Sequence, residues 1–203
     1  DNLKIKDNVG GGCVNGGGIG IRDSNGSITN TIVEGNHADE QGGGIYVRDS
    51  DVIIDRTIVS NNTDNYCDNC DYTNVTESSG IVARGAANVQ IYNSTIYNNP
   101  IVGTSFNYDD YTLHIANSII VNNADSNENS IDNATVIYSN LEDGESFSTT
   151  NITADPLFVD AENSNFSLHP NSPCIDSGTV DVDEDGIIDI FYYSGLFPDM
   201  GAV

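Results

Sequence analysis

The sequence has little positive charge and no tryptophan. Among its 203 residues, 6 are Lys or Arg and 31 are Asp or Glu, which gives a formal net charge of −25. Binding to nucleic acid or to an anionic bilayer depends on Lys and Arg, so this charge argues against both partners. No apolar run approaches the roughly 20 residues that cross a bilayer, so the sequence predicts no membrane span.

Proline is also scarce, with 5 residues, and no positive start followed by an apolar stretch opens the chain. From its opening, we therefore expect the chain to be a mature, already processed piece. Asn-x-Ser/Thr triplets permit glycosylation, although a chain rich in Asn, Ser and Thr forms such triplets by chance. The acceptor positions are Asn25, Asn61, Asn74, Asn93, Asn133, Asn151 and Asn165.

One short phrase recurs along most of the chain. Its copies follow each other after 26, 37, 24 and 21 residues. This spacing is typical of a coiled β architecture in which each turn forms one rung of a solenoid. The copies are Thr31-Ile32-Val33, Thr57-Ile58-Val59, Ser94-Thr95-Ile96, Ser118-Ile119-Ile120 and Ser139-Asn140-Leu141.

Alignment of these copies places β-branched residues in columns. Such columns are expected of parallel strands whose inner faces stack on equivalent neighbours. One column holds Ile28, Ile54, Ile91, Ile115 and Val136, and another holds Val33, Val59, Ile96 and Ile120. Asparagines follow at the next bend, where amide side chains can bond from rung to rung. This predicted asparagine ladder contains Asn36, Asn62, Asn99 and Asn123.

A glycine-rich strand precedes three of the copies, at residues 16–22, 42–48 and 80–84. The glycines indicate a tight corner rather than a phosphate loop, because no helix follows them. Arg22, Arg48 and Arg84 fall at nearly the same position in these strands. They are candidates for a glycan-binding face, or they relieve charge repulsion by pairing with neighbouring acids.

The pattern Gly-Gly-Gly-Ile-x-Val followed by Asn-Ser-x-Ile-x-Asn-Asn resembles the right-handed parallel β-helix repeat of secreted bacterial and archaeal proteins, over about residues 8–141. The tail, at 154–160, 165–178 and 198–202, resembles the closing module of surface-anchored β-helix proteins. The resemblance implies an all-β solenoid with β-helix rungs over 1–150, a Cys-x-x-Cys loop insertion near 63–79, and a loop-rich closing module over 151–203.

The strongest chemical motif is an acidic loop in this tail. Carboxylates at Asp181, Asp183, Asp185 and Asp189, together with the carbonyl of Ile187, can surround a calcium ion with oxygen atoms. The loop resembles those of dockerin and thrombospondin-type repeats. It departs from the EF-hand, because Tyr192 stands where the bidentate glutamate belongs. We expect a structural calcium site here; the alternative is a solvated acidic loop.

The four cysteines suggest two kinds of bond. Cys67 and Cys70, in the long turn, form either a local disulfide or half of a metal site, and an exported acidic protein favours the disulfide. Cys13 and Cys174 lie too many rungs apart to pair within one chain. They are either two buried thiols or an intersubunit disulfide between stacked molecules.

These observations predict an extracellular structural or cell-surface protein that assembles with itself head-to-tail, since a solenoid exposes strand edges at both ends. No convincing catalytic set stands in the sequence. The alternative is a calcium-dependent polysaccharide lyase or a glycan-binding module that uses the three arginines.

Overall fold

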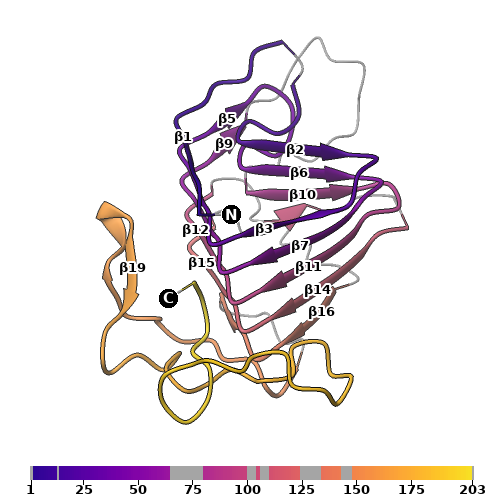
Figure 1. Cartoon of the computed structure of the whole chain (residues 1–203). Coiled ribbons are helices and arrows are strands. Elements are labelled where there is room, and N and C mark those ends of the chain that lie inside the picture. The colour runs from indigo at the N-terminus through magenta and orange to yellow at the C-terminus, as the bar shows by residue number, and fades with distance from the viewer. Residues whose placement is uncertain are drawn as a thin grey trace.

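A computed structural model of the chain describes residues 2–12, 14–64, 80–99, 104–105, 110–123, 134–142 and 148–202. These residues form an all-β fold dominated by three parallel sheets (Figure 1). Sheet 1 contains β1 (Lys4–Lys6), β4 (Ile32–Glu34), β8 (Ile58–Ser60), β12 (Thr95–Tyr97), β15 (Ile119–Val121) and β17 (Asn140–Leu141). Sheet 2 contains β2 (Ile19–Arg22), β6 (Ile45–Arg48), β10 (Ile81–Arg84) and β13 (Thr104–Ser105). Sheet 3 contains β3 (Gly26–Thr29), β7 (Asp51–Asp55), β11 (Asn88–Tyr92), β14 (Thr112–Ala116) and β16 (Ala134–Ile137).

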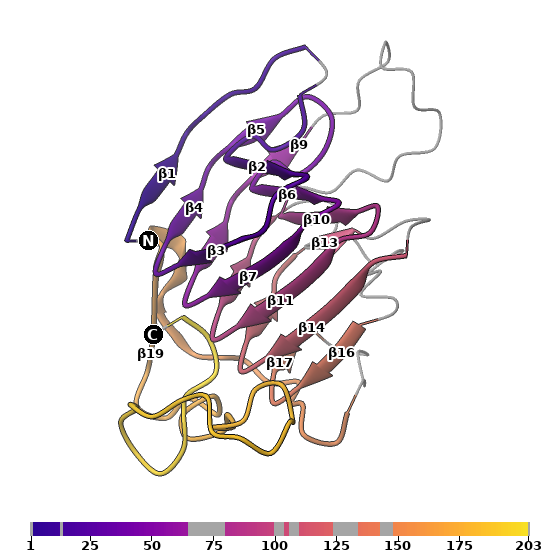
Figure 2. The ribbon, with the colours of Figure 1, turned by 45° about the vertical axis from the view of Figure 1, so that its right-hand side comes forward.

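The chain visits the three sheets in a repeating order. From β2 to β15, each strand of sheet 2 is followed by one of sheet 3 and then one of sheet 1. Equivalent strands of successive turns pair in parallel, so the turns lie on top of one another (Figure 2). A short parallel pair, β5 (His37–Ala38) with β9 (Thr63–Asp64), accompanies the first turns. The arrangement is compatible with the predicted solenoid.

The apolar columns predicted from the sequence are in register. Ile54 pairs with Ile28 on one side and Ile91 on the other, and Val59 pairs with Val33 and Ile96 in the same way. These side chains belong to one hydrophobic core that all three sheets enclose. The core is narrow and continuous because β-branched residues of the same size repeat from turn to turn.

The corners between sheets depend on residues with a left-handed backbone. One such residue stands directly before each ladder asparagine: Asp7, Gly35, Asn61, Asn98 and Asn122. Another set stands directly before each Thr or Ser of the recurring phrase: Asn30, Arg56, Asn93, Asn117 and Tyr138. Asn, Asp and Gly adopt positive φ most readily, which explains why Asn and Asp are so frequent at these bends.

The asparagine ladder forms as predicted and is longer than the sequence indicated. The backbone N–H and the amide of Asn36 both donate to Oδ1 of Asn62, and those of Asn62 donate to Oδ1 of Asn99. Asn8 extends the ladder at one end. At the other end, the N–H of Asn123 donates to Oε1 of Glu142, which replaces the next asparagine.

A second ladder of hydroxyl groups runs along the neighbouring bend. The backbone N–H of Ser94 donates to Oγ of Ser118, and the N–H of Ser118 donates to Oγ of Ser139. Each of these hydroxyls also donates to the carbonyl two residues earlier in its own turn. The N–H of Ser139 finally donates to Oδ1 of Asn151, so a side-chain amide ends this ladder.

The glycine corner predicted from the sequence is required by close approach. A Cβ atom on Gly44 would lie 2.5 Å from the carbonyl oxygen of Gly80 and 3.0 Å from Nδ2 of Asn62. Gly42 has a φ of +65°. Since an L side chain fits neither position without strain, the fold itself requires glycine here.

The C-terminal closing segment, residues 148–202, lies against the end of the stack and along sheet 1 (Figures 1 and 2). Ile152 bonds to the backbone of Ser139 and Leu141, which places it on the open edge of β17. The segment then forms an antiparallel hairpin of β18 (Phe158–Asp160), the short 3₁₀ helix η1 (Ala161–Asn163) and β19 (Asn165–Leu168). Phe158 and Phe166 pack their rings against Tyr97 on the outer face of sheet 1.

We expect Asn62→Ala to destabilise the protein by about 2–4 kcal/mol, because it leaves buried backbone groups of neighbouring turns without partners. Asn163→Ala is the matched control, since Asn163 is exposed and bonds only locally to Asp160. Urea unfolding followed by circular dichroism measures both. Equal losses in the two variants would contradict a structural role for the ladder.

Candidate functional site

The acidic loop predicted to bind calcium brings three carboxylates together. One oxygen from each of Asp181, Asp183 and Asp189 lies within 4.8 Å of the other two, a spacing that lets one cation contact all three. Oδ1 of Asp181 is buried without a hydrogen-bond partner among the described residues. Because an unpartnered buried carboxylate oxygen is costly, these residues fit a hard cation with oxygen ligands.

Backbone hydrogen bonds fold the loop around this cluster. The N–H of Gly186 donates to Oδ2 of Asp181 over 2.9 Å, and the N–H of Val182 donates to Oδ2 of Asp189 over 2.9 Å. Gly186 has a φ of +87°, which turns the chain sharply. The sequence predicted two further ligands, Asp185 and the carbonyl of Ile187. Asp185 lies outside the cluster and accepts the N–H of Ile187, and a ligand role for the Ile187 carbonyl stays a prediction.

The loop is attached to the outer face of sheet 3. The carbonyl oxygen of Val182 lies 2.6 Å from Nε2 of His114, in β14. The Val182 side chain is buried against Tyr92, Ala116 and Ile137. A cation bound by the acidic cluster would therefore fix a segment that is packed on sheet 3.

The carboxylates of this cluster affect the pKa of the nearby Tyr92. Burial raises its pKa to about 12, and the carboxylates of Asp183 and Asp189 add to this effect because they disfavour the phenolate. The ring of Tyr92 also meets that of His114 edge to face, with centroids 5.7 Å apart. The sequence alone did not indicate that Tyr92 lies close enough to the cluster for its pKa to depend on these carboxylates.

The three arginines predicted as a glycan face do form a column, since Arg48 is paired in register with both Arg22 and Arg84. Each of them has a partner within the protein. Arg22 lies over the ring of Tyr46 at 5.9 Å, and Nη1 of Arg84 donates to Oε1 of Gln41 over 2.9 Å.

Arg48 is paired with the acid that follows it. Its Nε donates to Oδ2 of Asp49 over 3.1 Å, and this hydrogen bond raises the pKa of Arg48. The pKa of Asp49 is lowered first by the N–H of Ala86 and then by Arg48. Charge relief by an adjacent acid is therefore seen at Arg48, whereas Arg22 and Arg84 contact uncharged side chains, and a glycan-binding role for the column stays a prediction.

The predicted glycosylation sites differ in accessibility. Asn165 is exposed, and its Oδ1 accepts the N–H of Ser167. The amide nitrogens of Asn25, Asn93 and Asn151 donate to Asp51, Asp55 and the Val136 carbonyl, and Asn61 is partly buried and accepts a bond from Asn98. Asn165 is therefore the most available of these five positions. Asn74 and Asn133 lie outside the described residues.

Of the four cysteines, Cys174 is the one that lies among the described residues. It is a free thiol with no exposed surface, packed against Ile119 and Met200, and burial raises its pKa. A thiol in this position cannot reach another molecule unless the closing segment opens, which argues against the intersubunit disulfide. Its expected partner Cys13 and the pair Cys67 and Cys70 lie outside the described residues.

A groove beside the cation cluster has no counterpart in the sequence analysis. It lies between the outer face of sheet 3 and residues 182–201, and Phe191, Tyr192 and Tyr193 line it. The aromatic run at 191–193, which closely follows the acidic loop, was the one sequence feature that could have indicated a binding surface here.

The comparisons with known proteins give no family for this chain: no family model, no curated protein and no solved structure matches it. Within the described residues, no helix has the length and apolar character needed to cross a membrane.

We expect the protein to lose stability as the pH rises from about 10 to about 12. In this window the unfolded chain ionises Tyr92, whose ordinary pKa is 10.0, whereas the folded chain keeps it protonated up to about 12. Unfolding measured across this range should show a smaller loss for Tyr92→Phe than for the wild type. Identical pH profiles would contradict the raised pKa.

Proposed function

We propose that this chain is an extracellular structural protein, built as a right-handed parallel β-helix with a calcium-clamped closing segment. The observation that carries the proposal is that two side-chain ladders join successive turns and are then ended by Glu142 and Asn151. Ladders of this kind stabilise a stack of equivalent turns, which suits a scaffold.

The closing segment supports a structural reading of the cation site. Asp181, Asp183 and Asp189 belong to a loop whose next contacts are with His114 and the core residues beneath it. A calcium ion here would join both ends of the loop and hold the segment on sheet 3. Calcium sites of extracellular modules bind at about 10⁻⁴–10⁻³ M, and a site of three carboxylates, two of them on exposed residues, fits weak binding of this kind.

The end of sheet 1 gives little support to head-to-tail stacking. A second molecule would need the free edge of β17, and Ile152 of the same chain already bonds to that edge. The scaffold role proposed here therefore does not depend on polymer formation. The lyase alternative is not favoured, because the three arginines have partners within the protein.

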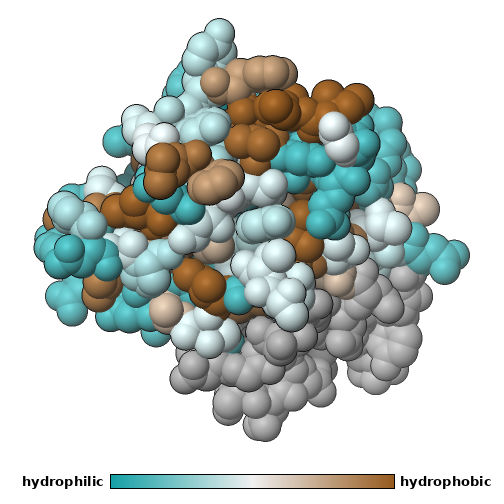
Figure 3. Space-filling model, turned by 90° about the horizontal axis from the view of Figure 1, so that it is seen from below, coloured by the Kyte–Doolittle hydropathy of each residue, from teal (hydrophilic) through white to brown (hydrophobic). Residues whose placement is uncertain are grey.

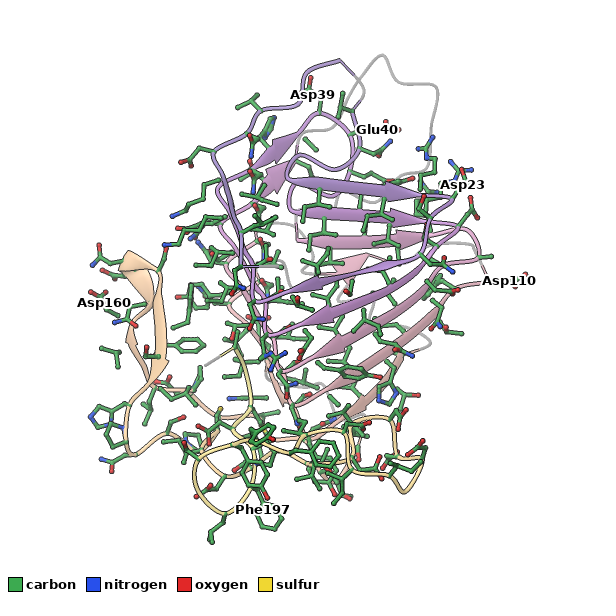
Figure 4. The ribbon with its side chains drawn as sticks, viewed as in Figure 1. Asp23, Asp39, Glu40, Asp110, Asp160 and Phe197 are labelled. Atoms are coloured by element: carbon green, nitrogen blue, oxygen red, sulfur yellow. The ribbon has the colours of Figure 1, made fainter. Side chains whose placement is uncertain are left out.

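We expect millimolar calcium to raise the melting temperature, and Asp181→Asn and Asp189→Asn to abolish this shift. Asp160→Asn is the control, because Asp160 is an exposed acid like Asp189 but lies in the hairpin, away from the loop (Figure 4). Differential scanning calorimetry with calcium, magnesium or chelator measures the effect. A shift that survives both loop substitutions would place calcium elsewhere.

The extracellular role predicts that the protein is accessible on intact cells. An antibody raised against the purified chain should label unpermeabilised source cells or the surrounding material. Mild protease treatment of those cells should remove the signal. Labelling that requires permeabilisation would contradict the proposal, as would the release of unsaturated sugars from acidic polysaccharides, detected by ultraviolet absorbance.

A further inference from the structure

The groove beside the cation cluster has the size of a ligand site. Its volume is about 860 Å³, which falls within the usual range of small-molecule pockets. One wall is the outer face of sheet 3, with Thr29, Ile53 and Gln90, and the other is the closing segment. The site is thus formed by two parts of the chain that are distant in sequence.

Three aromatic rings line this groove, and they are exposed rather than packed in the hydrophobic core. The exposed fraction is 70% for Phe191, 96% for Tyr192 and 45% for Tyr193. Figure 3 shows further apolar side chains on this end of the molecule; the exposed Leu196 and Phe197 are not part of the groove lining. Large exposed rings cost solubility, so their concentration beside a groove indicates recognition.

The charge in the groove is strongly one-sided. Four carboxylates line it, from Asp55, Asp183, Asp189 and Asp199, against one guanidinium, that of Arg56. Nη2 of Arg56 lies 2.9 Å from Oδ2 of Asp55, so this cation is already paired. Acidic residues also lie at the top and both sides of the molecule (Figure 4), and the net charge of −25 favours the approach of cations.

We propose that this groove binds a small organic cation of the amine class, with its ammonium groups held by the ring faces of Tyr192 and Tyr193 and by the carboxylate of Asp183. Ammonium groups are attracted to aromatic faces and to carboxylates, and this groove offers both. An anionic ligand is disfavoured by the same carboxylates. A neutral sugar would stack on the rings but would gain nothing from the charge.

The organic cation and the proposed calcium ion share two carboxylates. Asp183 and Asp189 belong both to the cation cluster and to the groove. Calcium would neutralise them and so weaken amine binding, and by linkage the amine would weaken calcium binding to the same extent. This coupling rests on the proposed calcium site, whereas amine binding itself does not.

The test uses the full chain and spermidine as the probe, in isothermal titration calorimetry at low salt without calcium. We expect saturable binding that weakens with added salt, and maltotriose should not bind. Tyr192→Ala should weaken spermidine binding roughly three- to thirtyfold, the range expected for a lost cation–π contact. Phe197→Ala is the matched control, since Phe197 is an exposed ring outside the groove and should leave the affinity unchanged.

The outcomes separate the two proposals. Absence of spermidine binding, or equal effects of Tyr192→Ala and Phe197→Ala, would overturn the groove proposal whatever calcium does. Binding of maltotriose as tight as that of spermidine, or binding of a lysine tripeptide alone, would overturn the small-amine assignment. If spermidine binds and Asp183→Asn weakens binding about fivefold or more, the proposal holds even where calcium has no effect on stability.

Discussion

Each turn of this protein is aligned with the next by buried side chains that bond across the bends. An asparagine that receives two hydrogen bonds from the turn before, and gives two to the turn after, fits only one register. A slip of one residue would turn every core residue outward, since strand side chains alternate between faces. The ladders therefore secure the apolar columns, and the columns define the three sheets.

Much of this fold could be predicted from the sequence because its repeats are local and regular. The columns through Ile54 and Val59 and the asparagine ladder are in the register that the alignment gave. The ends of the ladders could not be predicted, since Glu142 and Asn151 replace residues of the repeat with different side chains. Nothing in a repeat indicates which later residue will substitute for it.

The sequence could predict those parts of the candidate site that depend only on the spacing of residues within one loop. Three of the predicted ligands meet at Asp181, Asp183 and Asp189, because a sharp turn at Gly186 brings the two ends of the loop together. The groove could not be predicted, because it forms where residues 182–201 face sheet 3, and that placement depends on tertiary contacts. The arginine column and the pairing of Arg48 with Asp49 could be predicted, because both follow from local sequence, whereas the contacts of Arg22 with Tyr46 and of Arg84 with Gln41 could not.

The closing segment also crosses several turns. The hydroxyl of Ser164 bonds to Glu34 in β4, the N–H of Ala202 bonds to Thr95 in β12, and the amide of Asn140 in β17 bonds to the carbonyl of Ala154. In a simple stack, each turn contacts only its neighbours and the ends fray independently. Here the closing segment contacts both early and late turns, so partial opening at one end of the stack must also break contacts at the other end. The consequence is cooperativity: the stack should unfold as one unit rather than turn by turn.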